Sequence, residues 1–202
     1  TDAGEYDVEF EKDPVNNKDQ TGNYIVKGTE NGQLVITANE TEVVVKITGH
    51  KTEETYDGDT HKAEGYNVSI SNALYKESDF TFTGTAKVEG TNADTYQMGL
   101  NEGQFTNNNA NFKKVTFVVE DGQLVIKPRE VTLKANSGKF DYDRNPKTVS
   151  GFTCWDVETQ KEVTGLQFDE IIASRTETDA GEYDVEFEKD PVNNKDQTGN
   201  YI

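Results

Sequence analysis

Two short acidic stretches carry the side chains best suited to chemistry. The first holds Asp57 and Asp59 around a glycine, and the second holds Asp141, Asp143 and Asn145 in alternation. Alternating Asp and Asn can place several oxygens around one point, as calcium-binding loops do. The second stretch lacks the glycine at loop position six and the glutamate at position twelve. A weak calcium site therefore competes with an ordinary turn, which favours the same residue types for backbone reasons, and we prefer the turn. We predict no other cofactor.

Other reactive side chains also have structural interpretations that we prefer. Cys154 is the only cysteine, and no basic neighbour would lower its pKa. A buried thiol beside Trp155 is more typical than a thioester with Gln160. Lys46 or Lys134 could form an isopeptide crosslink with an asparagine, but a solvent-facing lysine avoids the cost of burying polar groups. Two histidines are too few for a zinc site, which typically needs three or four ligands.

The sequence contains no catalytic signature. The motifs GxSxG and HExxH and the phosphate-binding P-loop do not occur. Carboxylate pairs are so numerous that their presence is no sign of a glycosidase. Because no acid, base and nucleophile can be named as a set, we predict that the chain is not an enzyme.

Composition and charge narrow the classes of partner. The 202 residues include 38 acidic and 20 basic ones, which give a net charge of −18. Without a basic stripe, binding to nucleic acid has no electrostatic basis, and an anionic membrane surface would repel the chain. Apolar runs are far shorter than the roughly 20 residues that span a bilayer, so we expect no membrane insertion. Only 32% of the residues are hydrophobic, which favours small, thin modules over one large core.

Internal duplication organises the chain. Residues 1–25 and 178–202 are identical, which implies a repeat of 177 residues and suggests a piece of a longer protein. Inside this repeat, GQLVI occurs at 32–36 and again 90 residues later at 122–126. Two diverged modules therefore make one repeat. We place a C-terminal piece of a preceding module at 1–31, a first β module at 32–121 and a second at 122–202.

Alternation of apolar and polar residues predicts an all-β fold. In 4–11, for example, Tyr6, Val8 and Phe10 share one face of a strand. We expect about seven short strands in each module, which fits a small immunoglobulin-like β-sandwich. A β-grasp is the alternative. With little linker between them, the modules should stack as an elongated rod. We also expect a short helical turn in 71–79 and a strand that includes 24–27.

The motifs of both halves resemble those of the MBG and YDG domain families. The first set is Asn23-Tyr24, Gly32–Ile36, Tyr56-Asp57-Gly58 and Ala93-Asp94-Thr95-Tyr96. The second set is Gly122–Ile126, Pro128–Thr132, Tyr142-Asp143 and Ala180–Tyr183. The first module departs by carrying Thr37-Ala38 in place of Pro-Arg, and the second by Arg144 in place of a glycine. These families are tandem β-rich repeats of large surface adhesins of bacteria, mostly Gram-positive. The resemblance implies no ligand and no catalytic residues.

The repeat and the resemblance together predict a structural role. We expect a stalk or spacer that projects a binding tip from the bacterial cell wall, with neighbouring repeats of the same chain as its partners. This places the chain extracellularly, at the cell surface, attached through parts of the protein outside this sequence. The alternative is an adhesive module for a host glycoprotein or glycan, which needs an exposed aromatic patch. Tyr56, Tyr75 and Trp155 are the residues we assign to such a patch.

Overall fold

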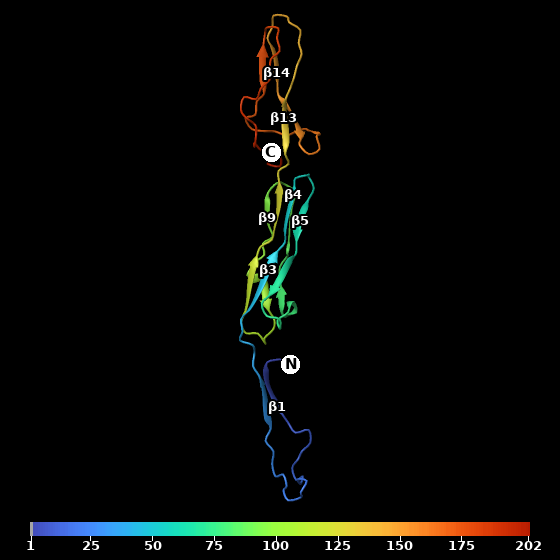
Figure 1. Cartoon of the computed structure of the whole chain (residues 1–202), viewed down its shortest axis with the longest axis vertical. Coiled ribbons are helices and arrows are strands. Elements are labelled where there is room, and N and C mark those ends of the chain that lie inside the picture. Colours follow the sequence, from blue (N-terminus) through green and yellow to red (C-terminus); the bar gives the residue numbers. More distant parts are fainter. Residues whose placement is uncertain (1) are drawn as a thin grey trace. The chain divides into compact units, whose positions relative to one another are not determined.

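The computed structural model describes residues 2–202 and confirms the all-β class (Figure 1). Strands make up 42% of the chain and helix 3%, and the rest is turns and irregular segments. The helices in the described residues are two single-turn 3₁₀ helices, η1 (Glu77–Asp79) and η2 (Glu102–Gln104). The strands are β1 (Gly4–Val8), β2 (Gly32–Ile36), β3 (Val43–Gly49), β4 (Lys51–Thr55), β5 (His61–Glu64), β6 (Tyr66–Ile70), β7 (Phe80–Phe82), β8 (Lys87–Gly90), β9 (Thr95–Gln97), β10 (Phe105–Asn107), β11 (Val115–Glu120), β12 (Gln123–Lys127), β13 (Val131–Ala135), β14 (Lys147–Ser150), β15 (Phe152–Asp156), β16 (Glu162–Val163) and β17 (Ser174–Glu177).

The chain divides into two compact units. The first takes the residues up to Thr48 together with Asn67–Thr85 and Leu100–Glu120. The second takes Gly49–Tyr66, Ala86–Gly99 and Asp121–Ile202. Each unit collects segments that are distant in the sequence, which is typical of sheets whose neighbouring strands are not consecutive in the chain.

The first unit is built around β3, which lies between β11 and β6 in a three-stranded sheet. β3 and β11 run parallel, with Val43 opposite Val115. Val43, Val45 and Ile47 are fully buried, as expected for the central strand of a sheet. An aromatic cluster extends this core. Its rings are those of Phe80, Phe82, Phe105 and Phe117.

The second unit contains two three-stranded sheets and two strand pairs. In one sheet, β12 lies between β4, to which it is parallel, and β9, to which it is antiparallel. Leu124 and Ile126 of β12 are 0% and 2% exposed, and β5 and β8 pack against this strand. β15 is the centre of the other sheet, between β13 and β16. The pairs are β5 with β8 and β14 with β17.

Each predicted module begins with a GQLVI segment, so the strand pairing of these two segments can be compared with the predicted boundaries. β2 pairs with β1, which comes from the predicted preceding module. β12 likewise begins the predicted second module, yet its partners β4 and β9 both precede it. The boundaries at 31/32 and 121/122 therefore stay predictions, with a strand just after each that pairs back across it.

Three local predictions can be compared with the described residues. The helical turn expected in 71–79 is the 3₁₀ helix η1. In place of a strand over 24–27, only Ile25 is paired, in an isolated bridge to Lys18. The reason is a tight turn in which the Asp19 carboxylate accepts the N–H groups of Asn23 and Tyr24. No helix among residues 2–202 has the length and apolar character to cross a bilayer.

Candidate functional site

The two acidic stretches form side-chain-capped turns. Asp57 Oδ1 accepts the N–H of Asp59 at 2.9 Å and lies 2.9 Å from Nε2 of His61. Asp143 Oδ1 accepts the N–H of Asn145 at 3.0 Å, and its Oδ2 accepts Lys147 Nζ at 2.7 Å. These bonds, the one from Lys147 first, lower the pKa of Asp143 to about 2.

This geometry is that of the turn interpretation. Within residues 2–202, no three His, Cys, Asp or Glu side chains are grouped so as to hold a metal ion. The hypothesis of a weak calcium site stays a prediction. Its residues are Asp57, Asp59, Asp141, Asp143 and Asn145.

The three aromatic residues assigned to a ligand patch have different environments. Tyr75 is 1% exposed, with its ring edge-on to Phe112 at 5.2 Å, so it is a core residue and cannot present its ring to a ligand. Tyr56 packs edge-on against Tyr201 at 5.3 Å. Trp155 is 37% exposed and donates from Nε1 to Thr153 Oγ1 at 3.0 Å. The assignment of Tyr75 to a surface patch is therefore wrong, because its ring is needed to fill the core.

Cys154 lies buried on β15, opposite Leu133 of β13. Burial, more than the nearby charge of Glu162, raises the pKa of its thiol. A raised pKa leaves little thiolate at neutral pH, which fits the preferred core interpretation and not a reactive thiol.

The most elaborate polar site in the second unit is one that sequence reasoning missed, and it begins with a turn at 196–201. Asp196 is 4% exposed and organises this turn. Its Oδ1 accepts the N–H of Tyr201 at 3.0 Å, while Oδ2 accepts the N–H and the hydroxyl of Thr198 at 3.1 and 2.7 Å. The carboxylate thereby satisfies backbone N–H groups of the turn and fixes the orientation of Asn200, which lies within the turn.

Asn200 connects this turn to the segment that leads into β9. Asn200 is 5% exposed. Oδ1 accepts the N–H of Ala93 at 2.7 Å, and Nδ2 donates to Asn92 Oδ1 at 3.2 Å. We call this arrangement of Asn92, Ala93 and Asn200 the asparagine clamp. It joins the first predicted module to the second through both polar atoms of one side chain.

The same arrangement recurs in the first unit, with Asn111 in the role of Asn200. Asn111 Oδ1 accepts the N–H of Ala3 at 2.5 Å, and Nδ2 donates to Asp2 Oδ1 at 2.9 Å. The backbone beside each asparagine is also bonded alike: Arg129 N–H donates to the Asn200 carbonyl at 2.8 Å, and Asn39 N–H to the Asn111 carbonyl at 2.7 Å. Both compact units thus contain the same connection.

An ion pair reinforces the connection in the second unit. The Arg129 guanidinium bonds the carboxylate of Asp156, and its Nη2 also lies 3.2 Å from Glu158 Oε2. Both Arg129 and Asp156 have little exposed side chain, at 18% and 5%. The hydrogen bond from Arg129 lowers the pKa of Asp156, which also accepts the N–H and hydroxyl of Thr159. In return the bond raises the pKa of Arg129.

Only part of this site had a signal in the sequence. Arg129 belongs to the Pro-Arg pair of the motif, which marks its position but not its partner. Asn200 has the same neighbours as Asn23, because 178–202 duplicate 1–25, yet Asn23 is exposed. Since sequence alone does not separate them, the role of Asn200 becomes visible only in the fold.

Comparison with known proteins gives one family-model match, in the central part of the chain. Residues 42–128 match the MBG domain. No curated protein and no solved structure matches the chain. MBG domains are non-catalytic repeat domains found in surface proteins.

Proposed function

From the match of residues 42–128 to the MBG domain, we propose that the chain is a stalk segment of a bacterial surface adhesin. Its task is to hold a binding tip away from the cell wall. The recurrence of the asparagine clamp carries this proposal, because a connection that is repeated between successive modules serves a tandem array.

The clamp contacts suit a load-bearing connection. Asn200 and Ala93 are 107 residues apart, so their bond ties together segments that the intervening chain connects only loosely. Breaking it would leave the half-buried Ala93 N–H without a partner, at a cost toward the lower end of about 1–3 kcal/mol. The ion pair of Arg129 and Asp156 adds a second restraint close by, through Arg129 Nη1 to the Tyr56 carbonyl at 3.5 Å. Such restraints hold a module in one orientation.

Location and partners follow from the same proposal. The chain belongs outside the cell, at the bacterial surface, and is attached through other parts of the protein. Its partners are the neighbouring repeats. A net charge of −18 would keep densely displayed copies apart by electrostatic repulsion.

The alternative, an adhesive module for a host glycoprotein or glycan, has less support. Tyr75 is buried, and Tyr56 is engaged with Tyr201, so Trp155 alone of the three assigned residues offers a substantially exposed ring. A pull-down of host glycoproteins with one, two and four modules tests this function. Retention that grows with module number would favour the adhesive module over the stalk.

Small-angle scattering tests the stalk directly. Proteins with one, two and three copies of the 177-residue repeat should have maximum dimensions that rise by a nearly constant increment. A stiff array lengthens in proportion to its copies, whereas freely jointed modules lengthen only as about the square root of their number. A maximum dimension that levels off with copy number would contradict the proposal.

A further inference from the structure

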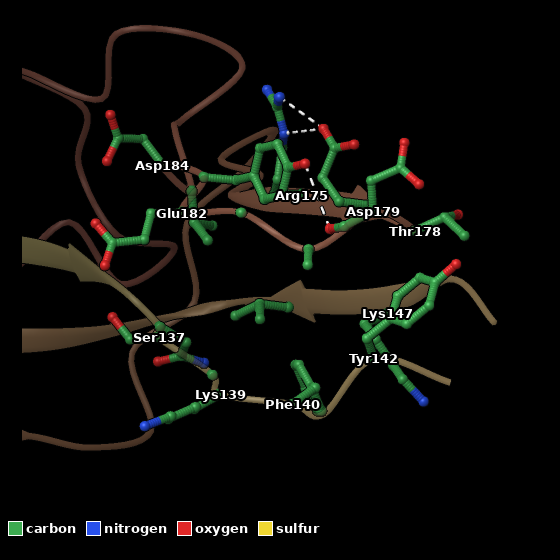
Figure 2. Close-up of a pocket in the computed structure, with 18 of the residues that line it drawn as sticks. Ser137, Lys139, Phe140, Tyr142, Lys147, Arg175, Thr178, Asp179, Glu182 and Asp184 are labelled. Carbon is green, nitrogen blue, oxygen red and sulfur yellow. Dashed lines mark hydrogen bonds and ion pairs between the residues drawn. The ribbon is translucent and has the colours of Figure 1, made fainter. Parts of the chain in front are cut away.

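The second unit contains an open groove of about 1160 Å³ (Figure 2). One wall is 137–142 and the other is 181–186, and residues of β14 and β17 also line it. Neither wall belongs to a strand. The groove nevertheless exposes large apolar rings, since Phe140, Tyr142 and Tyr183 are 54%, 60% and 41% exposed. Figure 2 shows Phe140 and Tyr142 on one wall, across the open space from Glu182 and Asp184 on the other.

The groove has a filled counterpart elsewhere in the same unit. β5 and β8 pair with His61 opposite Gly90. β14 and β17 pair with Lys147 opposite Glu177, which lie 86 residues after His61 and 87 residues after Gly90. The spacing of 86 residues relates β4 to 137–141, and the spacing of 87 residues relates β9 to 182–184. Between β4 and β9 lies β12, paired to both. The groove walls are thus equivalent to the two strands that flank β12.

One groove wall also has an identical twin with a partner. Residues 181–185 read GEYDV, as does β1. β1 pairs antiparallel with β2, which reads GQLVI, and places Tyr6 opposite Leu34. β9 and β12 show the same register, with Tyr96 opposite Leu124. Two separate pairs therefore assign the same partner sequence and the same register to 181–185, with a leucine opposite Tyr183.

The segment before Tyr183 already has the conformation of its paired twins. Tyr183 Oη donates to the Asp179 carbonyl at 3.3 Å. Tyr6 and Tyr96 make the same bond, to the carbonyls of Asp2 and Asn92 at 2.7 and 3.0 Å. The Arg175 guanidinium also lies 5.6 Å from the centre of the Tyr183 ring and holds it by a cation–π contact. A strand that arrives here would meet a prearranged edge.

We propose that this groove is an acceptor site for an extended strand with the sequence of β2, contributed by another repeat. The strand would lie antiparallel to 181–185 and parallel to 137–141, as β12 lies between β9 and β4. This is strand addition to an open sheet edge, in which main-chain hydrogen bonds give affinity and alternate side chains give specificity. The inference goes beyond the stalk function and does not depend on it.

Burial supports this choice of occupant. Leu34 on β2 is 51% exposed, whereas Leu124 of β12, against which β5 and β8 pack, is fully buried. A GQLVI strand in the groove would pack against β14 and β17, which are equivalent to β5 and β8, and cover Phe140 and Tyr183. Removing these apolar side chains from water is the driving force of the proposed pairing.

The hydrogen bonds of β12 to its two flanking strands show which N–H groups of the groove should become hydrogen-bonded when a strand binds. Met98 N–H donates to the Gly122 carbonyl at 2.8 Å, and Tyr56 N–H donates to the Lys127 carbonyl at 2.9 Å. Their equivalents in the groove are the N–H groups of Val185 and Tyr142. In the proposed complex these donate to the strand residues equivalent to Gly32 and Thr37.

The first test adds residues 26–38, VKGTENGQLVITA, directly after Ile202, where they follow the twin residue Ile25 in the first copy. Hydrogen exchange of the Val185 and Tyr142 amides should slow at least about tenfold relative to the chain as it stands. The control carries the same added segment with proline at the position of Ile36. This proline lacks the N–H whose counterpart in Ile126 donates to the Asp94 carbonyl at 2.9 Å. Equal exchange with the two added segments would overturn the proposal.

A second test supplies the strand in trans and does not alter the chain. The synthetic peptide VKGTENGQLVITA is titrated into isotopically labelled protein, with a peptide of the same composition in scrambled order as control. Amide resonances of 137–142 and 181–186 should shift with the GQLVI peptide alone. Equal shifts with the scrambled peptide, or shifts confined to β1, would show that the groove does not select this strand.

Discussion

Asn200 offers a test of the asparagine clamp with a built-in control. The substitution Asn200→Ala removes the acceptor of the Ala93 N–H and the donor to Asn92. Asn23→Ala makes the same change in the same sequence context, but Asn23 is exposed. The two variants therefore differ in whether the asparagine is part of a clamp, and hardly at all in local sequence.

The expected loss follows from the two bonds. Leaving the half-buried Ala93 N–H unsatisfied costs about 1–3 kcal/mol of unfolding free energy, and the exposed control should stay within about 0.5 kcal/mol of the parent. For a urea dependence of about 1–3 kcal/mol per M, the midpoint should fall by roughly 0.3–3 M.

Urea unfolding followed by fluorescence measures these losses, because Trp155 is the only tryptophan and lies in the second unit. Hydrogen exchange of the Ala93 amide gives a local readout, which should accelerate in Asn200→Ala and stay unchanged in Asn23→Ala. Equal midpoints for the two alanine variants, with no change in Ala93 exchange, would refute the reasoning that assigns Asn200 a connecting role.

Four further outcomes are expected from the contacts described above. Arg129 lowers the pKa of Asp156 in the folded protein, so the ionised Asp156 stabilises the fold. This contribution to the free energy of unfolding is fully present above the unfolded carboxyl pKa of about 4 and is lost as the pH falls through the folded pKa. Asp156→Asn should therefore lower the urea midpoint at pH 7 and make its decline below about pH 4 shallower; an unchanged pH profile would count against the ion pair. Gly49→Ala should destabilise by about 2 kcal/mol or more in the same assay, because a Cβ there would lie 2.3 Å from the Gly122 nitrogen, whereas Gly28→Ala meets nothing within 4 Å and should be near neutral. Cys154 should react with a thiol reagent at pH 8 only after unfolding, and rapid labelling of the folded chain would contradict its burial. Titration with millimolar calcium should leave the thermal midpoint unchanged if the acidic turns are structural, and a clear rise would favour the calcium hypothesis.

The all-β class could be predicted from the sequence because alternation reports local structure. The run Val43, Val45 and Ile47 alternates with polar or half-buried residues and forms the central strand β3. Its partner β11 lies more than sixty residues further on and runs parallel, and no local pattern specifies that pairing. Strand identity was therefore predictable where strand order was not.

Burial of single aromatic residues was harder to predict. Tyr75 follows a turn in a polar stretch, which made its ring a candidate for the surface. In the fold its hydroxyl lies 2.9 Å from Asn107 Oδ1, and its ring contacts Phe112, so residues more than thirty positions away make it a core residue. The clamp is a similar case, because Asn23 and Asn200 are indistinguishable until the fold brings Ala93 to one of them.

The proposed stalk function is tested most directly on a cell surface. A tagged tip is displayed on a Gram-positive cell behind one, two or three copies of the 177-residue repeat, and its height above the wall is measured by super-resolution microscopy. The stalk account predicts that the height increases with each added repeat, and that Asn200→Ala in every repeat reduces the increment. A tip that stays at one height whatever the number of repeats would contradict the account.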